Sequence, residues 1–238
     1  MLGGSFRAEV QPYATGFYYR NLDDFSSASA LSLVSDEAKT YVDDGFNFLK
    51  IKIGLAPIKD DIKRVEAIRT AVGENIILMA DPNHAYNVSN ALLIGRELQN
   101  LGVRFFEEPV VPEDHNGYYM LRNSLDMAIA GGECEYTRFG FRELIGKGCV
   151  DIAQPDICAA GGLSEYIKIS AFASAYNVSI LPHVWGSGIS MAASLHALAV
   201  TPWQPFTFFP VALQNEPIIE FDRNHNPLRD ELIEPRIQ

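Results

Sequence analysis

The sequence predicts an α/β protein built as a (β/α)8 barrel of the TIM type. Short apolar runs suited to buried parallel strands alternate with stretches of helical periodicity. Ionisable residues close successive apolar runs at intervals of 23 to 27 residues, from Asp81 to His183. In a barrel the carboxyl ends of all strands face one centre, whereas an open doubly wound sheet binds its ligand at one switch point. Side chains from five strands can share one substrate only in the barrel, so we favour it over the open sheet.

The strand and helix predictions follow the chain in order, and a clear example is residues 58–72, where apolar side chains recur every three or four positions. The predicted strands cover residues 13–19, 46–54, 76–80, 103–106, 127–130, 150–154, 179–181, 205–209 and 218–221. The predicted helices cover residues 35–45, 58–72, 91–101, 118–122, 139–145, 164–176 and 190–200. Neither a linker nor a break in composition interrupts them, so residues 1–238 are predicted to form a single barrel domain.

Composition excludes several functional classes. The 238 residues carry a formal net charge of −11 and no run of Lys and Arg, which argues against binding to nucleic acid or to an anionic membrane. The three cysteines lack CxxC spacing, and the amino terminus lacks a signal pattern. No apolar run is long enough to cross a bilayer. We therefore expect reduced thiols and a cytoplasmic protein.

Two lysines end the second predicted strand. Because side chains alternate along a strand, Lys50 and Lys52 share one face, and the apolar neighbours share the face that meets the helices. Two ammonium groups this close disfavour each other's protonation, and a lysine with a lowered pKa is a competent general base. The alternative is a pair of solvated lysines at a strand end.

Three acids end the next strands and predict a metal site. Asp81, Glu107 and Glu133 would repel one another if they converged, and a hard divalent cation is the simplest compensation. Mg²⁺ fits a site of a few carboxylates that leaves positions for water and substrate. Each acid taken singly is also compatible with a helix cap or a surface salt bridge. Glu108 should point away from Glu107 and support the site, while Asn83 could touch a ligand oxygen or cap a loop.

His183 is the candidate for a second base. An isolated histidine is more often a packed core residue than a catalyst. Asp156 ends the preceding strand, however, and an adjacent carboxylate can hold one ring nitrogen and raise the basicity of the other. Asp156 and His183 would then act on the side of the barrel opposite Lys52.

These segments together resemble the mandelate racemase/muconate lactonizing enzyme branch of the enolase superfamily. They read LKIKIG (49–54), ADPN (80–83), FEEP (106–109), GGE (131–133), QPD (154–156) and PHVWG (182–186), in order along most of the chain. Residues 13–16, 107–113 and 219–227 further resemble members of the family that act on sugar acids.

The resemblance implies a lyase or isomerase that binds Mg²⁺ on Asp81, Glu107 and Glu133. It implies Lys52 as one base and His183 with Asp156 as the other, and Lys50 would help neutralise a substrate carboxylate. Abstraction of the proton α to that carboxylate would give a metal-stabilised enediolate. β-Elimination would make the protein a sugar-acid dehydratase or a lactone cycloisomerase, and reprotonation a racemase or epimerase. The implied partners are a small-molecule carboxylate and further copies of the chain in a homo-oligomer.

The chain departs from this resemblance at three places. Residues 2–4 resemble the end of the α+β capping domain that precedes such barrels, so residues 1–8 are expected to be the junction with that domain, and the domain itself to be missing. Residues 223–238 are expected to be a truncated C-terminal extension. The acid that completes the site on the last strand has two candidates, Glu216 and Glu220. A further hypothesis is therefore a barrel fragment that binds metal without turnover.

Overall fold

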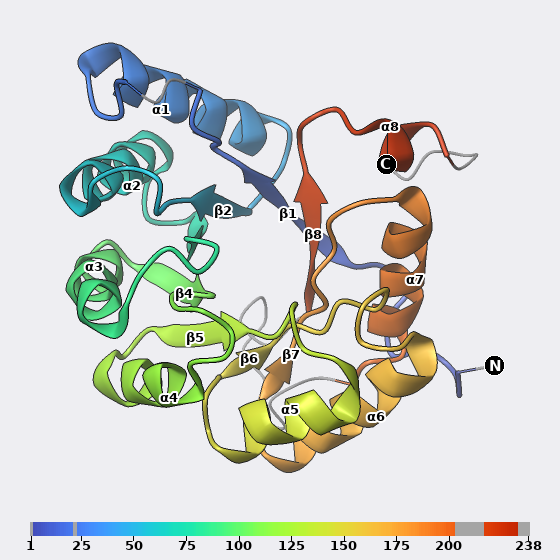
Figure 1. Cartoon of the computed structure of the whole chain (residues 1–238). Coiled ribbons are helices and arrows are strands. Elements are labelled where there is room, and N and C mark those ends of the chain that lie inside the picture. Colours follow the sequence, from blue (N-terminus) through green and yellow to red (C-terminus); the bar gives the residue numbers. More distant parts are fainter. Residues whose placement is uncertain (1, 21–22, 203–216, 233–238) are drawn as a thin grey trace. The chain divides into compact units, whose positions relative to one another are not determined.

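Strands and helices alternate along the whole computed structural model, which describes residues 2–20, 23–202 and 217–232 (Figure 1). The strands are β1 (Gln11–Gly16), β2 (Phe48–Lys52), β3 (Ile77–Asp81), β4 (Val103–Glu107), β5 (Ala128–Gly131), β6 (Ile152–Ala153), β7 (Ser179–Ile180) and β8 (Ile218–Asp222). The helices are α1 (Ala28–Asp43), α2 (Ile58–Val72), α3 (Val88–Asn100), α4 (His115–Ser124), α5 (Thr137–Gly146), α6 (Leu163–Ala175), α7 (Gly188–Ala199) and α8 (Pro227–Asp230). The alternation predicted from the sequence is confirmed.

The chain divides into two compact units. The first unit is Tyr13–Ala130, and the second unit combines Met1–Pro12 with Gly131–Gln238. Each unit carries part of the strand and helix series, and each is described by itself.

In the first unit the strands β1 to β5 follow one another as parallel neighbours, and α1 to α4 cover one side of them (Figure 1). The register pairs Lys52 of β2 with Asp81 of β3, so the carboxyl ends of these strands lie side by side. Between Leu78 and Ala80 the pairing with β4 shifts register. The inward stripe of α2 contains Val65 and Ile68 as predicted, and it also buries polar residues of the same helix. These polar residues are Asp61, Arg64 and Arg69.

In the second unit β6 and β7 are parallel neighbours, with Ile152 opposite Ser179. A core cluster forms around α7 and β8, and the amino-terminal segment reaches it because the backbone N–H of Phe6 donates to the carbonyl of Ala199 at 2.7 Å. The buried residues of this cluster are Val184, Met191, Leu198 and Ile219, with Val10, Leu195 and Phe221 packed against them.

Two differences from the predicted elements stand out, and one predicted strand cannot be compared. Strands β6 and β7 have two residues each, shorter than predicted, because Pro155 and Pro182 follow closely and cannot donate to a ladder. The four-residue helix α8 was not predicted from the sequence. The strand predicted at 205–209 falls outside the described residues.

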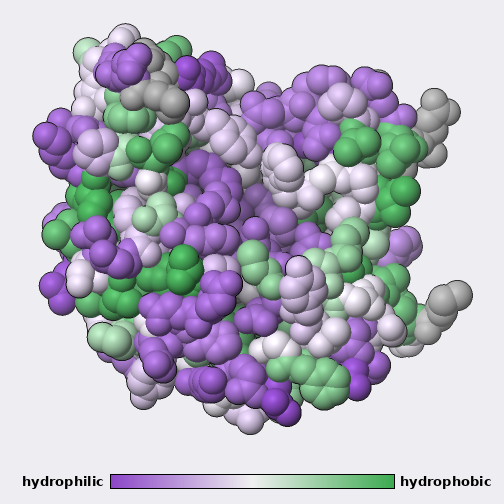
Figure 2. Space-filling view, viewed as in Figure 1, coloured by the Kyte–Doolittle hydropathy of each residue, from purple (hydrophilic) through white to green (hydrophobic). Residues whose placement is uncertain are grey.

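Among the described helices none is both long and apolar enough to cross a bilayer. On the face shown in Figure 2, hydrophobic residues reach the surface in separate groups with hydrophilic residues between them. The cytoplasmic location and the single barrel domain stay predictions.

Candidate functional site

A buried charge cluster lies at the carboxyl ends of β2, β3 and β4 in the first unit. The Nζ of Lys50 lies 2.8 Å from Oε1 of Glu107 and 3.4 Å from Oδ2 of Asp81. The ammonium of Lys52 also contacts Oδ2 of Asp81, and it donates to Oδ1 of Asn83 at 2.8 Å. The structure therefore brings together five of the residues predicted for the site.

Asp81 is ionised in this cluster because positive charge surrounds it. Its side chain is fully buried, which disfavours the carboxylate, but the ammonium groups of Lys50 and Lys52 outweigh that effect. The backbone N–H of Asn83 donates to Oδ1 of Asp81 at 2.9 Å and acts in the same direction. Together these contacts hold the pKa of Asp81 below its ordinary value. A carboxylate kept ionised in the interior is a strong ligand for a cation.

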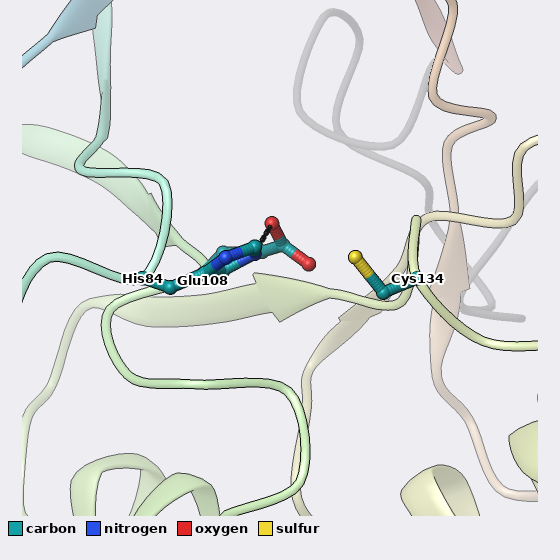
Figure 3. A group of neighbouring side chains, drawn as sticks. All are labelled: His84, Glu108 and Cys134. Atoms are coloured by element: carbon teal, nitrogen blue, oxygen red, sulfur yellow. Dashed lines mark hydrogen bonds and ion pairs between the residues drawn. The ribbon is translucent and has the colours of Figure 1, made fainter.

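A histidine that the sequence reading missed lies beside this cluster. His84 and Glu108 point toward each other, and Nε2 of His84 hydrogen-bonds to Oε2 of Glu108 (Figure 3). The backbone N–H of His84 also donates to the carbonyl of Glu108 at 2.9 Å. Glu108 is almost fully buried, as its predicted supporting role requires. The signal that could have found His84 is its position, three residues after Asp81 in the loop that follows a predicted strand.

The backbone around this pair is unusual. Asn83, His84 and Glu108 have φ values of 44°, 66° and 40°, a region that residues other than glycine rarely occupy. Such conformations cost about 1–3 kcal/mol each and cluster at ligand sites. The loops behind β3 and β4 meet at this pair, through the side-chain and backbone hydrogen bonds between His84 and Glu108.

A second cluster lies in the second unit, where Nδ1–H of His183 donates to Oδ2 of Asp156 at 2.8 Å. This bond leaves Nε2 as the nitrogen able to accept a proton, and Nε2 lies 3.4 Å from Oε2 of Glu133. Partial burial disfavours the Asp156 carboxylate, but His183 and the backbone N–H groups of Cys158 and Ala159 outweigh it and hold the pKa of Asp156 below its ordinary value. Asp156 is therefore a fixed negative partner that orients the ring.

The structure describes one of the two candidates for the acid on the last strand. Glu220 lies in β8 with its side chain buried. Glu216 lies outside the described residues.

The donor set of the first cluster fits a divalent cation. Oxygens of Asp81 and Glu107 already converge on one positive centre, the Lys50 ammonium, inside the protein. Carboxylate oxygens are the ligands that Mg²⁺ prefers. The third predicted ligand, Glu133, belongs to the second unit, where its carboxylate faces His183.

The chain is similar to known proteins in family, in sequence and in structure. A family model described as "Enolase C-terminal domain-like" matches residues 33–231. The chain is 40% identical to D-galactarolactone cycloisomerase of Agrobacterium fabrum, over 98% of its own length and 59% of the relative's. It is 37% identical to arabinonate dehydratase of Saccharolobus solfataricus, over 100% of its own length and 58% of that enzyme's. The chain thus spans less than two thirds of these relatives.

Solved structures give the same result. The 3,6-anhydro-D-galactonate cycloisomerase of Zobellia galactanivorans is 42% identical, with a TM-score of 0.83 over 97% of this chain and 59% of that one. A racemase of Streptomyces coelicolor, solved with bound magnesium, is 26% identical, with a TM-score of 0.77 over 92% of this chain and 58% of that one. The barrel class predicted from the sequence is confirmed by these matches.

Proposed function

Because the chain belongs to the enolase C-terminal domain-like family, we propose that it removes the proton α to a carboxylate, with sugar acids or their lactones as substrates. The family membership confirms the resemblance that the sequence motifs predicted. The names of the relatives support the substrate class, since they include a lactone cycloisomerase and a sugar-acid dehydratase. β-Elimination is accordingly the favoured second step.

The observation that carries the proposal is the pairing of His183 with Asp156. A histidine whose Nδ1–H is held by a carboxylate presents Nε2 as an oriented base, and the positive charge it gains is stabilised by the same carboxylate. We propose Lys52 as the base for the opposite face of the substrate. It must first lose its own proton: Lys50 nearby favours that loss, whereas the Asp81 carboxylate in contact with Lys52 opposes it.

We propose Asp81, Glu107 and Glu133 as the ligands of Mg²⁺. When bound, the cation would stabilise the negative charge that develops on the substrate carboxylate as the α-proton leaves. Lys50 would add positive charge near the same carboxylate. His84, held by Glu108, and Asn83, held by Lys52, would contact substrate oxygens, and Glu220 is the described candidate for the last-strand acid.

The test is proton exchange in D₂O. The purified chain is incubated with Mg²⁺ and a panel of aldonic acids, aldaric acids and their lactones, and the α-proton and products are followed by NMR. We expect a 2-keto-3-deoxy product or an opened lactone from the wild type. Lys52→Ala and His183→Asn should each reduce the exchange at least about 100-fold. Lys39→Ala and His196→Asn, which change exposed residues outside both clusters, should not.

Other outcomes favour other functions. Two candidate bases would also suit a racemase or epimerase, and exchange with inversion but without elimination would identify one. A third possibility, of another class, is a metal-binding barrel fragment without turnover. Silence across the whole panel would support that fragment and contradict the proposed reaction. The homo-oligomer stays a prediction that light scattering would test.

A further inference from the structure

A buried carboxylate outside both clusters joins three loops of the first unit. Asp61 lies in the first turn of α2 and its side chain has no exposed surface. Its Oδ1 accepts a hydrogen bond from the hydroxyl of Tyr19. Its Oδ2 accepts from the backbone N–H of Gly54 at 2.8 Å and from the hydroxyl of Tyr86 at 3.2 Å. Both oxygens of one buried carboxylate are therefore in use.

The three donors come from three successive loops at the carboxyl ends of the strands. Tyr19 follows β1, Gly54 follows β2, and Tyr86 follows β3. These are the loops that carry ligand-binding residues in barrels of this class. A carboxylate in a helix behind them can thus fix all three at once.

The loop after β2 is also pressed against the loop after β3. Gly54 has a φ of +98°, and a Cβ at this position would lie 2.6 Å from the Cβ of Ala85 and 3.0 Å from the Cβ of Pro82. The backbone N–H of Ile53 donates to the carbonyl of Asp81 at 3.1 Å. Only Ile53 separates Gly54 from Lys52, so the position of Gly54 constrains the end of the strand that presents Lys52 to Asp81.

Positive charge near the carboxylate comes from the same helix. The guanidinium of Arg64 lies 4.2 Å from the ring centroid of Tyr19 and donates to the carbonyl of Phe17 at 2.7 Å. Arg64 therefore contacts the loop after β1 in two ways, through the backbone carbonyl of Phe17 and through the ring of Tyr19. The arrangement fixes Tyr19 in place to donate to Asp61.

We propose that Asp61 is a positioning residue: it ties the loops after β1, β2 and β3 together and so holds Lys52 where its ammonium meets Asp81 and Asn83. The tie itself stands on the hydrogen bonds above, and its consequence for catalysis rests on the proposed role of Lys52. A substitution that keeps the shape of Asp61 but weakens the tie should loosen the three loops and misplace Lys52.

The first measurement tests the tie without any substrate. In Asp61→Asn the side-chain amide nitrogen must face either Tyr19 or the pair of Gly54 and Tyr86, so at least one acceptor is lost. Hydrogen–deuterium exchange with mass spectrometry should show amides of residues 53–57 and 82–87 exchanging at least about tenfold faster than in the wild type. Strand β5 should be unchanged. Asp36→Asn, at an exposed aspartate of α1, is the matched control. Equal exchange rates in both loops of Asp61→Asn would overturn the proposal.

The second measurement separates positioning from a general loss of folded protein. It uses two C2-epimeric acids that the wild type exchanges, assigned to the two bases by Lys52→Ala and His183→Asn. For the epimer deprotonated by Lys52, Asp61→Asn should lower kcat about 10- to 100-fold with little change in KM, and Tyr86→Phe should lie between the two proteins. The epimer deprotonated by His183 should keep its rate. Equal losses for both epimers would mean that Asp61 only stabilises the fold, which contradicts the proposal.

If the proposed function is wrong, the result differs from the one expected if only the role of Asp61 is wrong. If the wild type exchanges the α-proton of no acid tested, the reaction assigned above is wrong. The hydrogen–deuterium exchange of the loops after β2 and β3 then decides by itself whether Asp61 ties them.

Discussion

The ammonium of Lys50 lies 2.8 Å from Oε1 of Glu107, and the two side chains are 1% and 0% exposed. Each member of so deeply buried an ion pair requires the other, because removal of either partner leaves an uncompensated charge in the interior. The pair couples the stability of the first unit to the charge state of its candidate metal site.

We expect Lys50→Met to destabilise the protein by about 3–5 kcal/mol, since Asp81 and Glu107 would lose a shared cation. Urea unfolding measures this loss. Mg²⁺ should restore more stability to Lys50→Met than it adds to the wild type, and Lys39→Met, at an exposed lysine, should change neither value. Unchanged stability of Lys50→Met would contradict the buried ion pair.

Mg²⁺ should raise the melting temperature if the three acids bind it. A ligand present at 100 times its Kd adds about 2.7 kcal/mol to the free energy of unfolding. Differential scanning fluorimetry with and without EDTA would detect the shift. Glu107→Gln should reduce it strongly, whereas Glu143→Gln, on the surface of α5, should preserve it. An equal shift in both variants would place the metal elsewhere.

Asp156→Asn should lower the exchange catalysed by His183 by about 100-fold or more, because an amide can stabilise the wrong tautomer of the ring. The rate for the substrate epimer that uses Lys52 should change far less. NMR in D₂O with both epimers gives the two rates. Equal losses would show that Asp156 does not act through His183.

Arg69→Lys should cost about 2–4 kcal/mol of stability. The Arg69 guanidinium donates to the carbonyls of Leu101, Gly73, Ile76 and Gly102, at 2.9, 2.8, 2.7 and 3.2 Å respectively. A lysine ammonium cannot reach four carbonyls placed around a planar fork, so buried acceptors lose their donors. Arg142→Lys, at an exposed arginine, is the control for urea unfolding. A loss below about 0.5 kcal/mol would contradict the role of Arg69.

The pH dependence of stability should report Asp61. Burial raises the pKa of Asp61, although its hydrogen bonds and Arg64 act in the opposite direction. A raised folded-state pKa means that the folded protein binds this proton more tightly than the unfolded chain does. The stability it contributes is therefore complete below the unfolded pKa of 3.8 and is lost as pH rises through the higher folded pKa.

Asp61→Asn should lack that component. Urea midpoints measured at intervals from pH 4 to pH 7 should fall more steeply for the wild type than for the variant. Parallel curves for the two proteins would show that the pKa of Asp61 is not raised.

The strand ends could be predicted from the sequence because two patterns mark them: side chains alternate between the two faces along each strand, and an acid recurs where successive strands end. The register could not be predicted, and it is the register of β2 on β3 that sets Lys52 against Asp81. Ion-pair partners across strands depend on that alignment, which the sequence of one strand does not specify. The contacts of Lys50 with Asp81 and Glu107 follow from the same alignment of neighbouring strands.

The conformations and contacts of the loops behind the strands were harder still to predict. Side-chain alternation holds only while the backbone is extended, and it ends at Glu107 with β4. Glu108 then takes a left-handed conformation, and its partner depends on a similar turn at His84. The buried polar residues of α2 were missed for another reason. An aspartate near the start of a helix usually caps the helix or faces solvent, whereas loops that are remote in sequence bury Asp61.

The left-handed conformations of Asn83, His84 and Glu108 also bear on engineering for heat resistance. Glycine at these positions would relieve backbone strain in the folded chain, although at Glu108 it would also remove a buried, hydrogen-bonded side chain, so a screen that rewards only thermal tolerance would select glycine first at the exposed Asn83. The same replacements would delete the amide, imidazole and carboxylate that border the charge cluster. We expect variants selected for heat resistance alone to lose function first in these two loops, well before the barrel itself changes.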